Sequence, residues 1–118
     1  MESMRIHLGS VEQIPLGQGR CFMVGFHGVA VFRCRDGRLF AVRNSCPPLG
    51  GPLAEGVMGA GKVVCPLHGH KFDLVTGQGS ETNECVQTFK VWEENRDIVM
   101  LFVFPVVAAA NNHCATAH

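Results

Sequence analysis

The sequence predicts an all-β fold, an antiparallel β-sandwich or small barrel from which two loops project. Short apolar segments alternate with turn signals along most of the chain, and 14 of the 118 residues are glycine. Roughly seven to nine strands at such short spacing are typical of sandwiches and small barrels. The length is that of one domain. We expect this domain to span residues 1–105, followed by a flexible tail over residues 106–118 that shows no hydrophobic periodicity.

The composition excludes several classes of protein. Ten Lys and Arg residues balance ten Asp and Glu residues, so no basic excess is available to bind nucleic acid or an anionic membrane. Apolar residues make up 47% and charged residues 17% of the chain, which excludes disorder throughout. The longest apolar run, residues 98–110, contains Pro105 and is shorter than the roughly 20 residues that a membrane span needs. With no signal peptide recognisable at the N-terminus, we expect a cytoplasmic protein with reduced cysteines.

The N-terminal region predicts one strand and one helical turn. Residues 5–8 have the composition of a short strand. Ser10 can cap a helical turn that extends to Gln13, since its hydroxyl can accept a hydrogen bond from a backbone amide. Pro15 then stops the turn, because proline has no amide hydrogen to donate.

Two hairpins are expected next. Residues 21–26 and 29–34 are apolar on both faces, which predicts a buried hairpin with a bend at residues 25–28. Asp36-Gly37 separates the second of these strands from a further strand at residues 38–42. Asp-Gly readily adopts the positive φ angles of a two-residue hairpin turn.

The middle of the chain predicts two loops. Residues 44–61 are too rich in Pro and Gly for a regular strand and are predicted to be loop. Residues 62–64 form a short strand that leads into the second loop, residues 65–70. Residues 71–73 then form a strand before a turn at Thr76-Gly77.

The last two strands are predicted at residues 85–92, where the side chains alternate, and at residues 98–104, after a turn at residues 95–97. Free cysteine is among the most buried residue types. We therefore interpret the cysteines on predicted strands as small buried hydrophobic residues, namely Cys21, Cys34 and Cys85.

The two loops carry the candidate metal ligands. The first contains Cys46 in Cys-Pro-Pro-Leu-Gly-Gly-Pro, and the second contains Cys65 and His68 in Cys-Pro-Leu-His-Gly-His. The Cys-x-x-His spacing on a loop shaped by Pro and Gly lets a thiolate and an imidazole point into one coordination sphere. No nucleophile with a base and an orienting acid, and no phosphate-binding loop, is recognisable. We therefore predict no catalytic residue on this chain.

These motifs resemble the two cluster-binding loops of Rieske-type ferredoxin domains. The resemblance is carried by Cys46 and the glycines after it, by Cys65-Pro-Leu-His68, and by Phe72-Asp73 with Thr76-Gly77. It extends over about residues 4–104. It implies a Rieske-type fold, in which Cys-x-His in the first loop and Cys-x-x-His in the second hold a 2Fe-2S cluster through two Cys and two His.

The first loop departs from the family pattern at one position. Pro48 stands where the histidine ligand of that loop belongs, and the nitrogen of proline lies in the amide and cannot bind metal. Cys46, Cys65 and His68 are therefore an incomplete or vestigial ligand set. Because cluster stability depends on complete ligation, we expect no stable cluster on this chain.

Within the family, the motif Cys-Pro-x-x-Gly-Gly-Pro-Leu-Ala-Glu-Gly most resembles that of the small subunit of assimilatory NADH-dependent nitrite reductase. This resemblance implies a partner, a large subunit with flavin, sirohaem and an iron-sulfur cluster. That subunit reduces nitrite to ammonium with six electrons from NADH. Some small subunits lack the cluster ligands, which agrees with Pro48. We expect an accessory subunit that docks through the tips of its two loops.

Two other functions remain open at this stage. The chain could be a 2Fe-2S electron-transfer ferredoxin that uses Cys46, Cys65, His68 and an unidentified fourth ligand. It could also be a zinc module in which His70 completes a tetrahedral site. Alternatively, His70 hydrogen-bonds the loop backbone, and Cys46 and Cys65 form a reversible disulfide. Asp73 is expected to brace the second loop.

Overall fold

The chain is almost entirely β-structure, which confirms the predicted fold class. The computed structural model describes residues 2–45, 51–67, 69–80 and 84–104. These residues form nine strands, and every strand pairing among them is antiparallel. The strands and two short 3₁₀ helices are β1 (Glu2–Ser10), η1 (Val11–Gln13), β2 (Gln18–Val24), β3 (His27–Arg33), β4 (Leu39–Arg43), η2 (Leu53–Glu55), β5 (Val57–Gly59), β6 (Lys62–Val64), β7 (Lys71–Asp73), β8 (Thr88–Glu94) and β9 (Asp97–Phe104).

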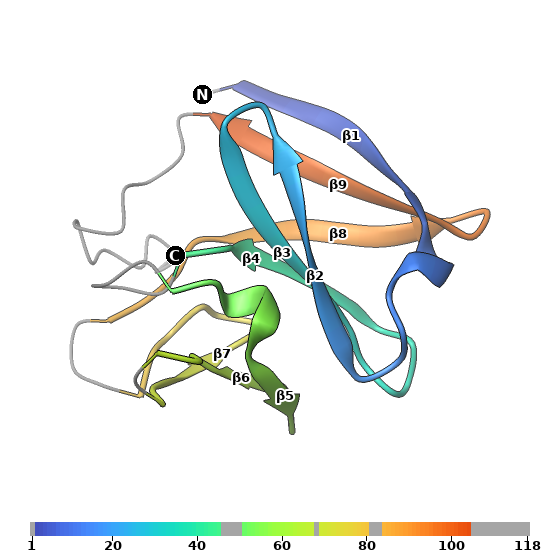
Figure 1. Ribbon diagram of the computed structural model, residues 1–118. Helices are drawn as coiled ribbons and strands as arrows, with labels where there is room; N and C mark the ends of the chain where they lie inside the picture. Colours follow the sequence, from blue (N-terminus) through green and yellow to red (C-terminus); the bar gives the residue numbers. More distant parts are fainter. Residues whose placement is uncertain (1, 46–50, 68, 81–83, 105–118) are drawn as a thin grey trace.

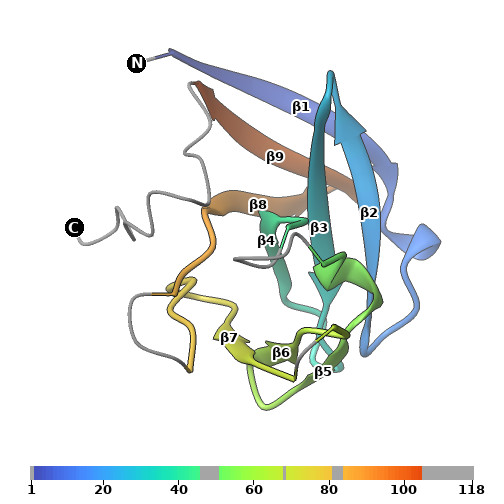
Figure 2. The ribbon, with the colours of Figure 1, turned by 60° about the vertical axis from the view of Figure 1, so that its left-hand side comes forward.

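The strands form two sheets of unequal size. The larger sheet has the order β1-β9-β8-β4-β3-β2 and curls strongly, whereas the smaller sheet has the order β5-β6-β7 (Figure 1). The view in Figure 2 shows the small sheet and η2 lying together on one side of the larger sheet. Both β1 and β2 are edge strands, because each has a neighbour on one side only.

Strand β3 separates two hydrophobic cores. Val29 and Val31 point into the core enclosed by the curled sheet, and Phe32 points into the core between this sheet and the small one. All three side chains are 0% exposed. This explains why the sequence of β3 is apolar at successive positions, as expected for a strand buried on both faces. The second core also contains side chains from β4, η2 and the small sheet, namely Val42, Leu53, Val63 and Phe72.

The prediction that both strands of the β2–β3 hairpin are buried is wrong for β2. One face of β2 is covered near the start of the strand, where a Cβ atom on Gly19 would lie 2.5 Å from the ring of Phe32. On the other face, Phe22 and Val24 are only partly buried against the core enclosed by the curled sheet. The side chains left exposed on β2 and at the tip of the hairpin are Cys21, Met23 and Phe26.

The turn at Asp36-Gly37 exists, but it is longer than predicted. The amide of Cys34 donates to the carbonyl of Arg38, and the amide of Gly37 donates to the carbonyl of Cys34. Only Gly37 has a positive φ, +92°. This pattern is typical of a three-residue hairpin loop, in which a type I turn is followed by a glycine in the left-handed region. Asp36 therefore stays in an ordinary conformation.

The prediction that residues 44–61 are entirely loop is wrong, because this stretch contains η2 and β5. Strand β5 can pair with β6 because Gly56, just before β5, passes very close to the backbone of β6. A Cβ atom on Gly56 would lie 2.2 Å from the carbonyl oxygen of Val64. Gly56 is one of the residues that suggested a loop, but its lack of a side chain is what lets β5 pair with β6.

The predicted strand at residues 85–92 starts later than expected. Cys85 forms an isolated bridge with Gln78, and the amide of Val86 donates to the carbonyl of Gly77. This segment therefore pairs locally before β8 joins the larger sheet at Thr88. At the N-terminus, the predicted cap is confirmed, since the amide of Glu12 donates to Oγ of Ser10 over 3.0 Å.

One prediction lies beyond what the structure tests. Residues 105–118 are outside the described residues, so the flexible tail stays a prediction. Within the described ranges, no helix has the length and apolar character that crossing a membrane would require.

We expect Gly56→Ala to lower the free energy of unfolding by about 1–3 kcal/mol, because the added methyl group would collide with the backbone of β6. Urea denaturation followed by circular dichroism measures this change. Gly59→Ala is the matched control, since nothing lies within 4 Å of a Cβ atom there, and it should change stability by less than about 0.5 kcal/mol. Equal stability of the two variants would contradict the packing argument.

Candidate functional site

The first candidate loop is anchored at both ends by Asn44. The backbone amide of Asn44 donates to the carbonyl of Gly28 in β3 over 2.9 Å. Its side-chain Oδ1 accepts a hydrogen bond from the amide of Ala54 in η2 over 2.7 Å. One residue therefore ties the chain that enters the loop to the chain that leaves it. Cys46 and Pro48 lie between these anchors, outside the described residues.

The second candidate loop is closed by its own backbone. The amide of Cys65 donates to the carbonyl of His70 over 2.8 Å, and the amide of Gly69 donates to the carbonyl of Cys65 over 3.0 Å. Cys65 is 1% exposed and belongs to the core between the two sheets. His68 lies outside the described residues. Of the three predicted ligands, the structure therefore places Cys65 alone.

The described parts of the two loops touch each other. A Cβ atom on Gly51 would lie 2.8 Å from Cγ of Leu67 and 3.3 Å from Sγ of Cys65. The backbone at Gly51 is thus in direct contact with the second loop. This contact agrees with the expectation that the loops face each other, whereas the ligand set Cys46, Cys65 and His68 stays a prediction.

The imidazole of His70 pairs with a carboxylate. Nδ1 of His70 lies 2.9 Å from Oε1 of Glu84, and the side chains are 29% and 14% exposed. The expected hydrogen bond from this imidazole to loop backbone is therefore replaced, at Nδ1, by a side-chain contact. The carbonyl of Glu84 also accepts from the amide of Gly79 over 2.8 Å. Glu84 thus contacts the second loop, and no local sequence signal indicated this.

The described residues do not by themselves fit a metal or a 2Fe-2S cluster. Within the described ranges, no three His, Cys, Asp or Glu side chains come together as a metal site. Cys65 is present as a thiol, so the alternative disulfide with Cys46 is absent from this structure. In the sequence, Pro48 removes the histidine of the first loop. We therefore derive no chemical step through a cluster.

The cysteines outside the loops differ in their surroundings. Cys21 is exposed and Cys34 is half-buried, so the prediction that they are buried hydrophobic residues is wrong for Cys21. Burial raises the pKa of the Cys34 thiol, and the nearby carboxylate of Asp36 raises it further. Cys85 is buried as predicted, but it is part of a disulfide whose other half lies outside the described residues.

Asp73 stabilises the turn that follows β7. Its Oδ1 accepts hydrogen bonds from the amides of Val75 (2.8 Å) and Thr76 (3.0 Å), and Nζ of Lys62 lies 3.5 Å from Oδ2. Burial on its own would raise the pKa of Asp73, but the two amides and Lys62 outweigh it and hold this pKa below its usual value. Asp73 therefore braces the turn after the second loop, as a carboxylate that stays ionised.

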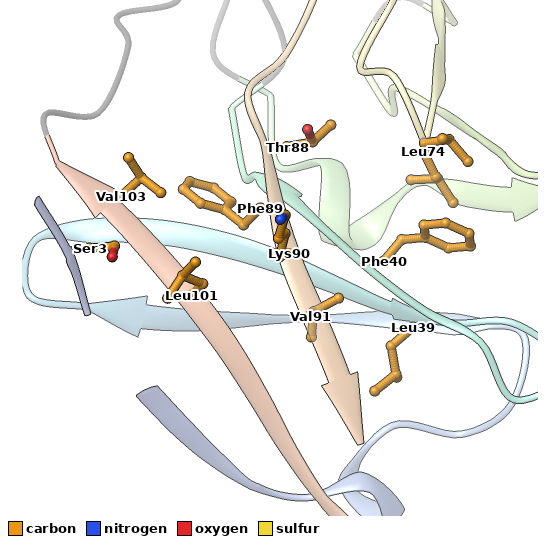
Figure 3. A pocket seen from close by; sticks show the side chains of 11 residues that line it. Ser3, Leu39, Phe40, Leu74, Thr88, Phe89, Lys90, Val91, Leu101 and Val103 are labelled. Carbon is orange, nitrogen blue, oxygen red and sulfur yellow. The ribbon is translucent and has the colours of Figure 1, made fainter. Parts of the chain in front are cut away.

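A shallow hollow lies beside β8 and β9, and Cys65 is not among its lining residues. Its volume is about 720 Å³. Figure 3 shows side chains from β4, β8 and β9 around it, among them Phe40, Val91 and Leu101. Its described lining contains no Cys, His, Asp or Glu, and Lys90 is the one charged residue in that lining. The hollow is therefore lined mainly by apolar side chains, with the hydroxyls of Ser3 and Thr88 and the ammonium group of Lys90 among them.

The comparison with known families gives one match over most of the chain. A family described as the Rieske-like [2Fe-2S] domain matches residues 6–112. Among curated proteins, apoptosis-inducing factor 3 of Mus musculus and of Homo sapiens are each 33% identical over 69 residues. This match covers 58% of the chain but 10% of either relative. The chain thus spans about a tenth of the length of these two proteins.

Two solved structures resemble the chain over nearly their whole length. The ferredoxin of carbazole 1,9a-dioxygenase from Nocardioides aromaticivorans has a TM-score of 0.74 at 26% identity, and the match covers 81% of this chain and 95% of that one. A protein from Mycobacterium tuberculosis, assigned as the small subunit of NADH-dependent nitrite reductase, has a TM-score of 0.80 at 21% identity. That match covers 87% of this chain and 98% of the other. The second likeness is evidence of a common fold.

We expect three thiols of the folded protein to react with iodoacetamide in a fixed order. Cys21 should react first because it is exposed. Cys34 should follow, since its raised pKa leaves less thiolate at pH 8. Cys65 should react only after unfolding, because it is 1% exposed. Mass spectrometry of the digested protein gives the order, with a sample in guanidinium chloride as the control. Labelling of Cys65 as fast as that of Cys21 in the folded protein would contradict the placement of the second loop.

Proposed function

This chain belongs to the Rieske-like [2Fe-2S] domain family, and from this premise we propose that it is the small, accessory subunit of a cytoplasmic NADH-dependent nitrite reductase. The large subunit would reduce nitrite to ammonium with six electrons, using its own flavin, sirohaem and iron-sulfur cluster. This chain would bind the large subunit and stabilise or orient it. The likeness to the Mycobacterium tuberculosis protein, which covers 98% of that chain, supports the proposal.

The observation that carries the proposal is Pro48. It removes one of the four ligands that the family uses for its cluster. Cys46, Cys65 and His68 would then be a vestigial set, and the chain would hold no stable cluster. A family member without a complete cluster site cannot act as an electron carrier through that cluster. Its remaining role would be to make contact with a partner enzyme.

The two loops supply a surface for that contact. Leu67, at the second loop, is 55% exposed although its Cγ lies close to Gly51 of the first loop. Both loops are held by hydrogen bonds at their bases, through Asn44 in one case and through Cys65 and His70 in the other. A surface that is already ordered loses little entropy on binding. The described bases of the two loops are ordered in this sense, and the proposed docking through the loop tips would start from them.

A second function is favoured by a different comparison. The solved ferredoxin of carbazole 1,9a-dioxygenase is 26% identical over 81% of this chain. By this likeness the chain would be a 2Fe-2S electron-transfer ferredoxin, with Cys46, Cys65, His68 and a fourth ligand that the sequence does not identify.

A third function is a zinc module, in which His70 would be the fourth ligand beside Cys46, Cys65 and His68. The contact between His70 and Glu84 favours it, because histidines that bind metal commonly hydrogen-bond a carboxylate through the other ring nitrogen.

We expect protein made under anaerobic, iron-replete conditions to be colourless, without stoichiometric iron, acid-labile sulfide or zinc, because its ligand set is incomplete. Visible absorption spectroscopy and metal analysis of the purified chain measure this. Pro48→His is the informative variant, since it restores the ligand pattern of the family and should raise the iron and sulfide content. A red-brown wild-type protein would favour the ferredoxin function, and stoichiometric zinc would favour the zinc module.

We expect the chain to co-elute with the large subunit of nitrite reductase and to raise its NADH-dependent reduction of nitrite. Size-exclusion chromatography and an assay of nitrite consumption, each with and without the chain, measure the two effects. The control is Gly59→Ala, which alters a site with open space around it and should behave as wild type. Absence of co-elution together with unchanged activity would refute the accessory role.

A further inference from the structure

Phe26 is exposed to a degree unusual for an aromatic side chain. It is 99% exposed at the tip of the β2–β3 hairpin, the highest value among the large apolar side chains that the structure describes as exposed. Gly25 and Phe26 alone connect Val24 and His27, which pair with each other as the last residues of the two strands. Phe26 therefore lies in the two-residue turn that joins β2 and β3. The β2–β3 hairpin can be followed in Figures 1 and 2.

The turn holds the backbone of Phe26 in a defined conformation. Gly25 has a φ of +64°, as the first central position of a type II′ hairpin turn requires. At the base of the turn, the ring of His27 lies 5.6 Å from the ring of Phe102 in β9. The hairpin is therefore tied to the adjacent part of the larger sheet. Because the turn already fixes the backbone, an aromatic side chain at this position has only its own two torsion angles left to order when it binds.

Two further exposed side chains lie on β2 near the base of the first candidate loop. Met23 is 64% exposed, and Cys21 is exposed on the same face of β2. A Cβ atom on Gly28 would lie 3.6 Å from Sγ of Cys21, 3.8 Å from Sδ of Met23 and 3.5 Å from Cβ of Asn44. Asn44 is the residue that anchors the first loop. On β2, the surface of the hairpin thus lies close to the base of the loop that the proposed function assigns to docking.

The composition of this surface indicates a protein partner. Residues 21–28 read Cys-Phe-Met-Val-Gly-Phe-His-Gly and contain no Lys, Arg, Asp or Glu. The centres of protein interfaces are enriched in aromatic residues and Met and depleted in charged residues. Surfaces that bind anionic membranes instead combine apolar with basic side chains. The absence of basic residues from this segment therefore favours a protein over a lipid surface.

We propose that Phe26, in the same hairpin as the exposed Met23, is an anchor that inserts into an apolar pocket on the partner oxidoreductase. The inference rests on the proposed function, because it takes the large subunit of nitrite reductase as that partner. Phe26 fills the pocket, and Met23 and Cys21 extend the contact toward the first loop. Residues that fill a pocket at the centre of an interface contribute far more to affinity than those around them.

The test measures the affinity of the full chain for the large subunit of nitrite reductase by biolayer interferometry. Phe26→Ser should weaken binding about tenfold or more, as the loss of a central aromatic anchor does. Phe26→Leu, which keeps an apolar side chain, should retain most of the affinity. Val75→Ser is the matched control, since Val75 is 63% exposed in the turn after β7, and it should bind as wild type. Thermal unfolding of all three variants should match the wild type, because each side chain is exposed.

The possible outcomes separate this inference from the proposed function. If wild type binds and Phe26→Ser binds equally well, the anchor is refuted and the accessory role stands. If wild type does not bind the large subunit, both are refuted. Equal weakening by Phe26→Ser and Val75→Ser would overturn the anchor as a specific contact. So would an effect of Phe26→Ser that is confined to self-association in sedimentation velocity, or to binding of phosphatidylcholine-phosphatidylglycerol vesicles.

Discussion

The burial of β3 on both faces is the constraint on which the rest of the structure depends. Val29 and Val31 on one face and Phe32 on the other are 0% exposed, in two different cores. Burial of apolar surface is the main favourable contribution to folding, so β3 fixes the curled sheet and the small sheet relative to each other. The small sheet, of three short strands, would have little core of its own without Phe32 and its neighbours. The candidate loops begin at strands that β3 holds in position.

The same core positions the described part of the site. Cys65 lies in the cluster that contains Phe32 and Phe72, so the base of the second loop is fixed by packing. The first loop depends on β3 in another way, since the carbonyl of Gly28 accepts a hydrogen bond from Asn44. A hydrogen bond of this kind contributes about 0.5–1.5 kcal/mol to stability. Both loops therefore take their orientation from one strand.

Features set by local chemistry could be predicted from the sequence, and those set by distant contacts could not. The fold class, the cap at Ser10 and the strands at residues 62–64 and 71–73 follow from periodicity and turn residues. Strand β5 was missed because its existence depends on how closely Gly56 approaches β6. The spacing of Cys65 and His68 identified the second loop, but Glu84 was missed because it lies 14 residues from His70 and meets it only in the folded chain. Exposure of β2 follows from its position at the sheet edge, which an apolar segment cannot reveal.

Several contacts within the protein hold the described frame around the candidate site. Asn44 joins the two ends of the first loop, the backbone closes the second, and Glu84 holds the imidazole of His70. Small metal-dependent domains unfold without their metal because they have little else to stabilise them. Here two hydrophobic cores perform that task, so loss of a cluster ligand at Pro48 need not cost the chain its fold. Under the proposed function, the shape of a cluster-binding domain would then serve as a surface for binding a partner.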